Sequence, residues 1–292
     1  MSARSFHRDG QRGWAHDEGH AAGTFETYDA LDLGYLGPRK VHVFLPRHRA
    51  ARCPVVYMHD GDTAFWPGGV ARGTWDVAGT LSALQGRVEP LIVVAVHPLR
   101  RDFEYTHIDW RGGREPWGDL PRYARWLAER VKPWIDAQYP TDPGRASVVG
   151  SSHGGLASFW TATRHPGAFG AAGCLSPSFF SGLDDLGTGD SREVTLASSS
   201  LVADVAPLLR DPARRPRLWI CWGTRRDGGA HNAIVEALAA RRGREMVDLL
   251  RDGFGYQEGR ELWVREDRGA GHDEPAWRRR FGELALALHG LG

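Results

Sequence analysis

The sequence predicts an α/β fold in which a mostly parallel central sheet is flanked by helices on both faces. First, short apolar runs typical of strands alternate with segments whose apolar residues recur at helical spacing. Second, the runs at 54–62 and 91–98 begin with uninterrupted apolar residues, as strands buried on both faces do. Third, 292 residues, 41% hydrophobic and 25% charged, are typical of one large soluble globular domain.

The first segment of the chain fits neither pattern. Residues 1–22 are rich in Gly, His and charge, and we expect a loose N-terminal arm or a peripheral lid. Two strands follow at 25–33 and 40–46, and they could pair as a hairpin. Beyond the first buried strand, helical spacing predicts a helix over 75–86, with Gly86 as its C-cap.

The strongest predicted helix covers residues 120–139. Pro133 lies inside it and is expected to kink it. Its apolar stripe consists of Leu120, Tyr123, Trp126, Leu127, Val131, Trp134 and Ile135.

The second half of the chain continues the alternation. Residues 181–215 fit neither pattern and would form a cap or a surface excursion, within a single domain over 23–292. The expected strands are 145–150, one within 170–180, 217–223 and 261–266, and the expected helices are 155–166, 231–243 and 275–290.

Composition argues against several classes of partner. The formal net charge of +1 gives no support to nucleic acid, and no apolar run is long enough to span a membrane. The polar N-terminus lacks the apolar core of a signal peptide, which favours a cytoplasmic protein. Cys53, Cys174 and Cys221 lie in predicted core strands and are expected to be buried free thiols.

The stretch VVGSSHGGLASFW, residues 148–160, places a serine on a sharp turn. Gly150, Ser152 and Gly154 form a G-x-S-x-G pattern, with a strand before it and a helix after it, which is the context of a nucleophile elbow. Such a turn presents the hydroxyl of its central serine at the helix N-terminus. Ser152 is therefore the predicted nucleophile, and a strand-to-helix packing turn is the structural alternative.

A base and an acid should follow the nucleophile in the chain. His272 lies after the last predicted strand and Asp227 after the one before, at the edge where the carboxyl ends of parallel strands meet. His272 would accept the Ser152 proton, and Asp227 would orient the imidazole. A Ser–His dyad without a strong acid remains an alternative. The acids that compete with Asp227 are Asp267, Asp273 and Glu274.

Two backbone N–H groups would form the oxyanion hole. One belongs to His153, directly after the nucleophile. The other would come from the loop after the strand at 54–62, where Gly61 permits a sharp turn and Asp62 supplies the N–H. Asp60 and Asp62 could instead suggest a metal, but two acids without further ligands are a weak signal, and we predict no metal site.

These stretches resemble the Putative esterase family of α/β-hydrolases, which includes enterochelin-type siderophore esterases, esterase D, feruloyl esterases and mycolyltransferases. The resemblance covers about residues 25–290 and rests on GSSHGGLAS, YMHDGD, the RRDFEYTHIDW stretch at 100–110, and GAGH followed by Trp277. We expect this protein to lack the N-terminal domain of the larger enterochelin esterases.

The resemblance implies an α/β-hydrolase fold without a cofactor. It implies Ser152 as nucleophile, His272 as base and an oxyanion hole at Gly61 and Asp62. The predicted function is a serine carboxylesterase that acts on a small-molecule ester through a Ser-His-Asp triad and an acyl-enzyme intermediate. Acyl transfer on the same triad and a non-catalytic binding protein on the same fold are the alternatives.

Aromatic and basic residues in loops at the same edge are candidates for substrate binding. Packing of the helices that follow these loops is the alternative. The candidates are Trp66, Trp110, Trp117 and Trp277, with Arg101 and one of Arg225 and Arg226 for an anionic substrate.

Overall fold

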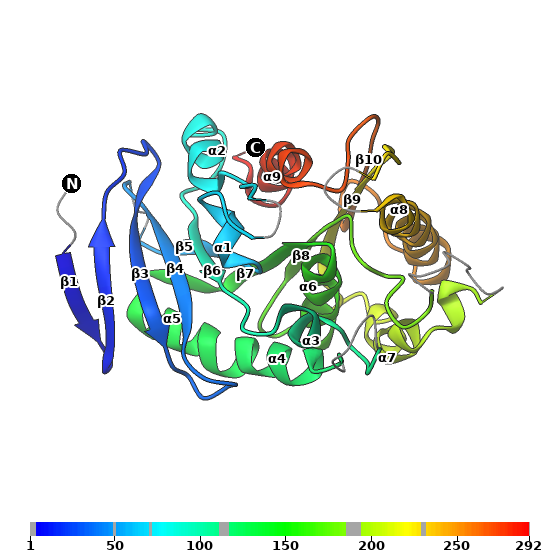
Figure 1. Ribbon diagram of the computed structural model, residues 1–292, viewed down its shortest axis with the longest axis horizontal. Helices are drawn as coiled ribbons and strands as arrows, with labels where there is room; N and C mark the ends of the chain where they lie inside the picture. The colour runs from blue at the N-terminus through cyan, green and yellow to red at the C-terminus, as the bar shows by residue number, and fades with distance from the viewer. Residues whose placement is uncertain are drawn as a thin grey trace.

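The computed structural model describes residues 4–48, 51–69, 72–110, 117–184, 194–228 and 232–291. Within these residues ten strands form one sheet, in the order β1-β2-β3-β4-β6-β5-β7-β8-β9-β10 (Figure 1). The strands are β1 (Arg4–Arg8), β2 (Gln11–His16), β3 (Gly23–Leu31), β4 (Arg39–Pro46), β5 (Cys53–Met58), β6 (Ile92–Val96), β7 (Thr141–Ser151), β8 (Ala171–Leu175), β9 (Arg217–Gly223) and β10 (Leu262–Asp267).

The sheet is parallel from β6 to β10 and antiparallel at its N-terminal side. Strands β5 to β10 pair with parallel register, whereas β1, β2, β3 and β4 join the sheet through antiparallel pairs. Every residue of β5, β6 and β8 is buried, as their uninterrupted apolar runs predict. The carboxyl ends of the parallel strands therefore meet at one edge of the sheet.

Helices cover both faces of the sheet, as predicted. In Figure 1, α2 and α9 lie above the sheet, and α4, α5 and α6 lie below it. Val56 and Met58 of β5 pack in the core with α2 and α9, while Val55 and Tyr57 pack in the core with α4, α5 and α6. The helices are α1 (Gly61–Ala64), α2 (Val77–Ala83), α3 (Arg101–Tyr105), α4 (Leu120–Trp126), η1 (Leu127–Val131), α5 (Lys132–Gln138), α6 (His153–Arg164), η2 (Leu196–Ser198), α7 (Ser200–Leu209), α8 (Ala233–Asp248), η3 (Leu249–Gly253) and α9 (Glu274–His289).

The prediction of a loose arm over residues 1–22 is wrong for the two segments that form β1 and β2. The two strands make an antiparallel hairpin that turns at Asp9 and Gly10, both with positive φ, and β2 pairs with β3. The Phe6 ring lies edge-on to Tyr28 with 5.5 Å between ring centroids, so the hairpin is packed on the domain. Histidine, glycine and charged residues hid the strand alternation in the sequence.

The helix predicted over 120–139 is present, with one irregular turn. The π-helical turn η1 joins α4 to α5, and the backbone N–H of Lys132 donates to the Leu127 carbonyl five residues back. Pro133 follows directly and has no N–H to donate. The irregular turn therefore lies next to the residue at which the sequence predicts a kink.

The expected cap over 181–215 contains α7 and the short turn η2 among its described residues, and residues 185–193 lie outside them. The three cysteines are free and buried, as expected. In the described part of the chain no helix is long and apolar enough to cross a membrane.

Candidate active site

The loops at the carboxyl edge of the parallel strands carry the predicted site residues. They are Asp62 after β5, Ser152 after β7, Asp227 after β9 and His272 after β10. Strands β5 and β7 are neighbours in the sheet, β8 separates β7 from β9, and β10 follows β9. The fold therefore brings these four loops to the same edge.

Ser152 occupies the strained turn that the sequence predicts. Its backbone has φ 55° and ψ −121°, a conformation unfavourable for a residue with a Cβ atom. β7 ends at Ser151 and α6 begins at His153, so Ser152 alone makes the turn. A Cβ atom on Gly150 would lie 2.6 Å from the Gly154 carbonyl oxygen, so the close approach of strand and helix requires glycine.

Other hydroxyl groups surround the Ser152 side chain. Its Oγ lies 3.2 Å from the Ser178 Oγ. The Ser178 Oγ also lies 3.4 Å from His153 Nδ1, and the Ser181 Oγ lies 3.4 Å from His153 Nε2. All four side chains are buried. Ser178 and Ser181 were not predicted as site residues, although small polar residues directly after a strand at this edge were a signal.

The loop after β5 leads directly into α1. Asp60 is in the left-handed conformation, with φ 53° and ψ 53°, and α1 begins at Gly61. A Cβ atom on Gly61 would lie 2.8 Å from the Ala95 carbonyl of β6, so only glycine fits there without a shift. The His59 N–H donates to the Val149 carbonyl at 3.0 Å and ties this loop to the strand that precedes the elbow.

Asp62 lies in the first turn of α1. The first N–H groups of a helix have no partner within the helix, which suits an oxyanion donor. Burial, and next the neighbouring Asp60 carboxylate, raise the pKa of the Asp62 side chain.

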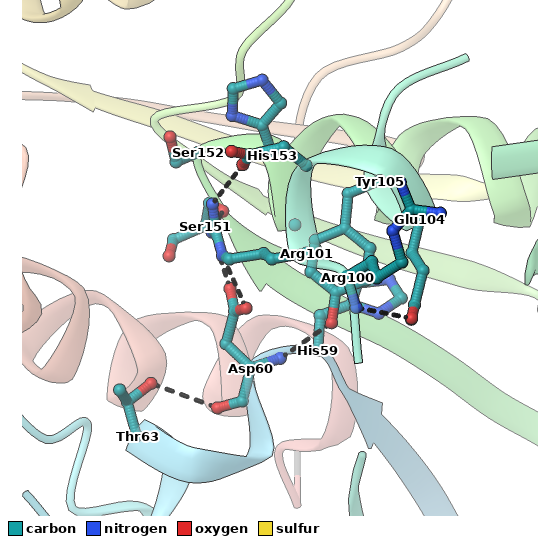
Figure 2. Close-up of polar contacts among 12 residues, drawn as sticks. His59, Asp60, Thr63, Arg100, Arg101, Glu104, Tyr105, Ser151, Ser152 and His153 are labelled. Atoms are coloured by element: carbon teal, nitrogen blue, oxygen red, sulfur yellow. Dashed lines mark hydrogen bonds and ion pairs between the residues drawn. The ribbon is translucent and has the colours of Figure 1, made fainter. Parts of the chain in front are cut away.

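Asp60 is held by an arginine (Figure 2). The Arg101 guanidinium donates to both Asp60 carboxylate oxygens, at 2.7 and 2.8 Å, and to the Ser151 carbonyl at 3.4 Å. Burial alone would lower the pKa of Arg101, but the attraction of the Asp60 carboxylate is larger, so the pKa of the arginine is raised. Arg101, a predicted substrate residue, thus joins the β5 loop to the elbow. Among the described residues no cluster of three or more His, Cys, Asp or Glu could hold a metal ion.

A second ion pair fixes the segment that carries Arg101. Arg39 Nη1 lies 2.8 Å from Glu104 Oε2, and both side chains are fully buried. The other Glu104 oxygen accepts the backbone N–H groups of Leu99 and Arg100 at 3.0 and 2.9 Å. Figure 2 shows Glu104 and Arg101 on the same short helix, α3.

His272 is buried in the loop after β10, with 3% of its surface exposed. Its ring lies edge-on to Trp277, with 5.3 Å between centroids. The Trp277 indole N–H donates to the Ser176 Oγ at 3.4 Å. Ser176 stands two residues before Ser178, which contacts Ser152. The predicted base and nucleophile therefore both adjoin the segment that follows β8.

The Asp227 side chain is 59% exposed and is ion-paired with Arg225. Arg225 Nε is 3.1 Å from Asp227 Oδ1, and Arg225 Nη2 is 2.8 Å from Asp273 Oδ2. One guanidinium thus joins the loop after β9 to the residue that follows His272. Gly271 makes this approach possible, because a Cβ atom there would lie 2.5 Å from Arg225 Nη2.

Asp267, Asp273 and Glu274 are the acids that compete with Asp227, and each has a structural role of its own. Asp273 caps α9, where its carboxylate accepts the Ala276 N–H at 3.0 Å. Asp267 accepts from Arg280 Nε at 2.7 Å. Glu274 begins α9, and burial raises its pKa.

Glu236 is a buried carboxylate that the sequence analysis did not single out. It lies in the first turn of α8 with 3% of its surface exposed, and it lines one small cavity together with His272 and Ser176. Its Oε2 accepts the Gly228 N–H at 3.1 Å. Acidic residues are common in the first turn of helices, so the pattern did not mark this one.

The tryptophans predicted to bind substrate do not all lie at the elbow. The Trp66 indole N–H donates to Glu18 Oε2 at 2.8 Å, so this side chain anchors the N-terminal segment. Trp110 and Trp117 meet edge-on at 5.3 Å between centroids, and Trp117 meets the His153 ring edge-on at 5.3 Å. These two tryptophans thus pack against each other beside the elbow.

The sequence model of the family described as Putative esterase matches residues 36–288. Among solved structures, the siderophore hydrolase EstA from Aspergillus nidulans is similar with a TM-score of 0.68 and 18% identity, over 92% of this chain and 97% of that chain.

Two further solved structures share the fold. The enterobactin esterase FES from Shigella flexneri, determined in the presence of 2,3-di-hydroxy-N-benzoyl-glycine, has a TM-score of 0.61 and 16% identity, over 91% of this chain and 59% of that chain. MPT51 (FbpC1) from Mycobacterium tuberculosis has a TM-score of 0.59 and 20% identity, over 88% of this chain and 94% of that chain. The fold is that of the α/β-hydrolases.

Proposed function

The chain belongs to the Putative esterase family of carboxylic ester hydrolases, and on that premise we propose that it is a serine carboxylesterase with Ser152 as its nucleophile. The observation that carries the proposal is the backbone conformation of Ser152. Its φ is positive, so this residue belongs neither to β7 nor to α6 but forms the turn between them. Strain of this kind persists only where the surrounding structure imposes it, and it is typical of functional positions.

In the proposed mechanism the Ser152 Oγ attacks the ester carbonyl while His272 accepts its proton. The tetrahedral oxyanion is bound by the N–H groups of His153 and Asp62. His272 then gives the proton to the departing alcohol, which leaves an acyl-enzyme on Ser152. Water, with His272 again as base, releases the carboxylic acid and restores the serine.

We assign the acid of the triad to Asp227. Its support is the Arg225 guanidinium, which contacts Asp227 in the loop after β9 and Asp273 directly after His272. Glu236 is the second candidate, because its buried carboxylate lines the same cavity as His272.

The proposed substrate is a small-molecule ester, and the names of the similar structures include a siderophore hydrolase and an enterobactin esterase. Acyl transfer to an alcohol would use the same acyl-enzyme with an acceptor in place of water. Product analysis with an added alcohol separates hydrolysis from transfer.

The experiment that tests this function compares Ser152→Ala with Ser151→Ala in the hydrolysis of p-nitrophenyl acetate. We expect Ser152→Ala to lose about 10⁴-fold or more in kcat/KM and to keep its fold, because only one hydroxyl is removed. Ser151 is the matched control, a buried neighbouring serine at the end of β7. A large loss in Ser151→Ala alone would show that the nucleophile is wrongly assigned.

A further inference from the structure

A chain of hydrogen bonds behind Ser152 has no part in the mechanism above. It runs from the Ser152 Oγ to the Ser178 Oγ at 3.2 Å and on to His153 Nδ1 at 3.4 Å. We propose that Ser178 orients the nucleophilic hydroxyl, and that the His153 side chain is a positioning residue that orients Ser178. This inference rests on the proposed role of Ser152.

The backbone holds Ser178 at this distance. Its N–H donates to the Ser152 carbonyl at 3.0 Å, and the Ser152 N–H donates to the Leu175 carbonyl at 2.9 Å. Pro177 packs against the start of α6, where a Cβ atom on Gly155 would lie 3.1 Å from the Pro177 Cα. The separation of the two hydroxyl groups is thus set by the elbow and the segment after β8.

The His153 ring is fixed on its far side. Its Nε2 faces the Ser181 Oγ at 3.4 Å, and Trp117 lies edge-on to the ring at 5.3 Å between centroids. Ser178 and Ser181 belong to one turn, in which the Ser181 N–H donates to the Ser178 carbonyl at 3.0 Å. The ring therefore presents Nδ1 to Ser178 and Nε2 to Ser181.

The direction of the hydrogen bonds decides where the Ser152 proton points. A hydroxyl group has one proton and two acceptor lone pairs. If His153 Nδ1–H donates to Ser178, then Ser178 donates to Ser152, and the Ser152 proton is left for the base. If His153 Nδ1 accepts instead, Ser178 accepts from Ser152 and the proton is turned away from the base. The active enzyme has the first arrangement, with Ser181 donating to Nε2.

The first test measures the reaction of Ser152 with a fluorophosphonate, in which the Oγ–P bond forms, the P–F bond breaks and the serine proton goes to the base. We expect Ser178→Ala to lower the second-order rate constant about five- to tenfold, the effect of one hydrogen bond. The final labelled fraction should stay complete, because the defect is in orientation. Ser178→Thr, which keeps the hydroxyl, should restore most of the rate.

The matched control is Ser158→Ala, which removes a buried hydroxyl from α6. Its Oγ donates to the Gly154 carbonyl at 2.8 Å and is outside the chain from Ser152 to His153. We expect its rate constant to stay within about twofold of the parent value. An equal loss in Ser158→Ala and Ser178→Ala would overturn the inference, because the effect would then not depend on the chain from Ser152 to His153.

The second test uses amides in place of the His153 ring. The Asn amide reaches the position of Nδ1, beside Ser178, whereas the Gln amide reaches the position of Nε2, beside Ser181. We expect His153→Asn to react several-fold faster than His153→Gln. The reverse order, or a Ser178→Ala rate within twofold of the parent, would overturn the inference. Failure of the proposed function is a separate result, in which Ser152→Ala still hydrolyses esters.

Discussion

At the scale of single residues, Ser152 combines positive φ with burial among the hydroxyl groups of Ser178 and Ser181 and the His153 ring. A strained backbone of this kind costs about 1–3 kcal/mol, which the surrounding packing must offset. The proposed acid of the triad is less constrained, because Asp227 is exposed and ion-paired with Arg225. A screened, exposed carboxylate stabilises an imidazolium less than a buried one does.

The first prediction separates the two candidate acids. Asp227→Asn should lower kcat by about 10²–10³, because an amide no longer fixes the tautomer of His272. Glu236→Gln should cost less than Asp227→Asn. Loss of the carboxylate that faces the imidazole should also lower the apparent pKa in the pH profile of kcat/KM.

The measurement is the full pH profile of both variants with p-nitrophenyl acetate. The assignment of Asp227 is contradicted if Glu236→Gln is the slower variant and is the one whose profile moves. Asp273→Asn serves as control, because Asn caps a helix about as well as Asp and the change removes only a carboxylate next to His272.

At the scale of elements, the site depends on how closely β7 and α6 approach at the elbow. The contact involves backbone atoms on both sides, so no side-chain movement can relieve an added methyl group at Gly150. The loop after β5 is fixed in the same way, by Gly61 against β6 and by the Asp60–Arg101 ion pair. Close backbone packing at two glycines therefore positions the site, together with the ion pair that holds the β5 loop.

A second prediction follows from that packing. Gly150→Ala should destabilise the protein by about 1–3 kcal/mol or more and remove esterase activity, because the turn must open to admit the Cβ atom. The matched control is Gly170→Ala, directly before β8, where an added Cβ atom would meet nothing within 4 Å. Urea unfolding and p-nitrophenyl acetate turnover measure the two effects. Equal stability in the two variants would contradict the packing argument.

At the scale of the whole molecule, burial keeps several histidines neutral. Burial lowers the pKa to about 3 for His42 and to about 4 for the others. The residues are His42, His59, His97, His107 and His289. In the unfolded chain a histidine has a pKa of about 6.5. Between these values the unfolded chain binds more protons than the folded one, so stability rises with pH.

The third prediction is therefore a loss of stability on acidification from about pH 6.5 towards pH 4. Each such histidine contributes about 1.4 kcal/mol per pH unit below its unfolded pKa. The urea midpoint should be lower at pH 5 than at pH 7. His42→Gln should reduce this difference, and the exposed His7→Gln should leave it unchanged. A difference that is the same in both variants would contradict the role of His42.

The sequence predicted those elements whose structure depends on residues close together in the chain. The apolar runs of β5 and β6 and the G-x-S-x-G turn of Ser152 were identified because each depends on neighbouring residues. The β1–β2 hairpin was missed because its packing on Tyr28 involves a distant strand. Ser178 and the Arg101–Asp60 ion pair were missed for the same reason, since each contact joins separate loops. Such contacts exist only after the sheet has brought those loops to one edge.

The most direct test of the central assignment is the mass of the intact protein after reaction with a fluorophosphonate, followed by mapping of the modified peptide. We predict one adduct, on Ser152, with ester hydrolysis lost in proportion to the modified fraction. An adduct on Ser151 or Ser178, or hydrolysis that survives complete modification of Ser152, would contradict the assignment.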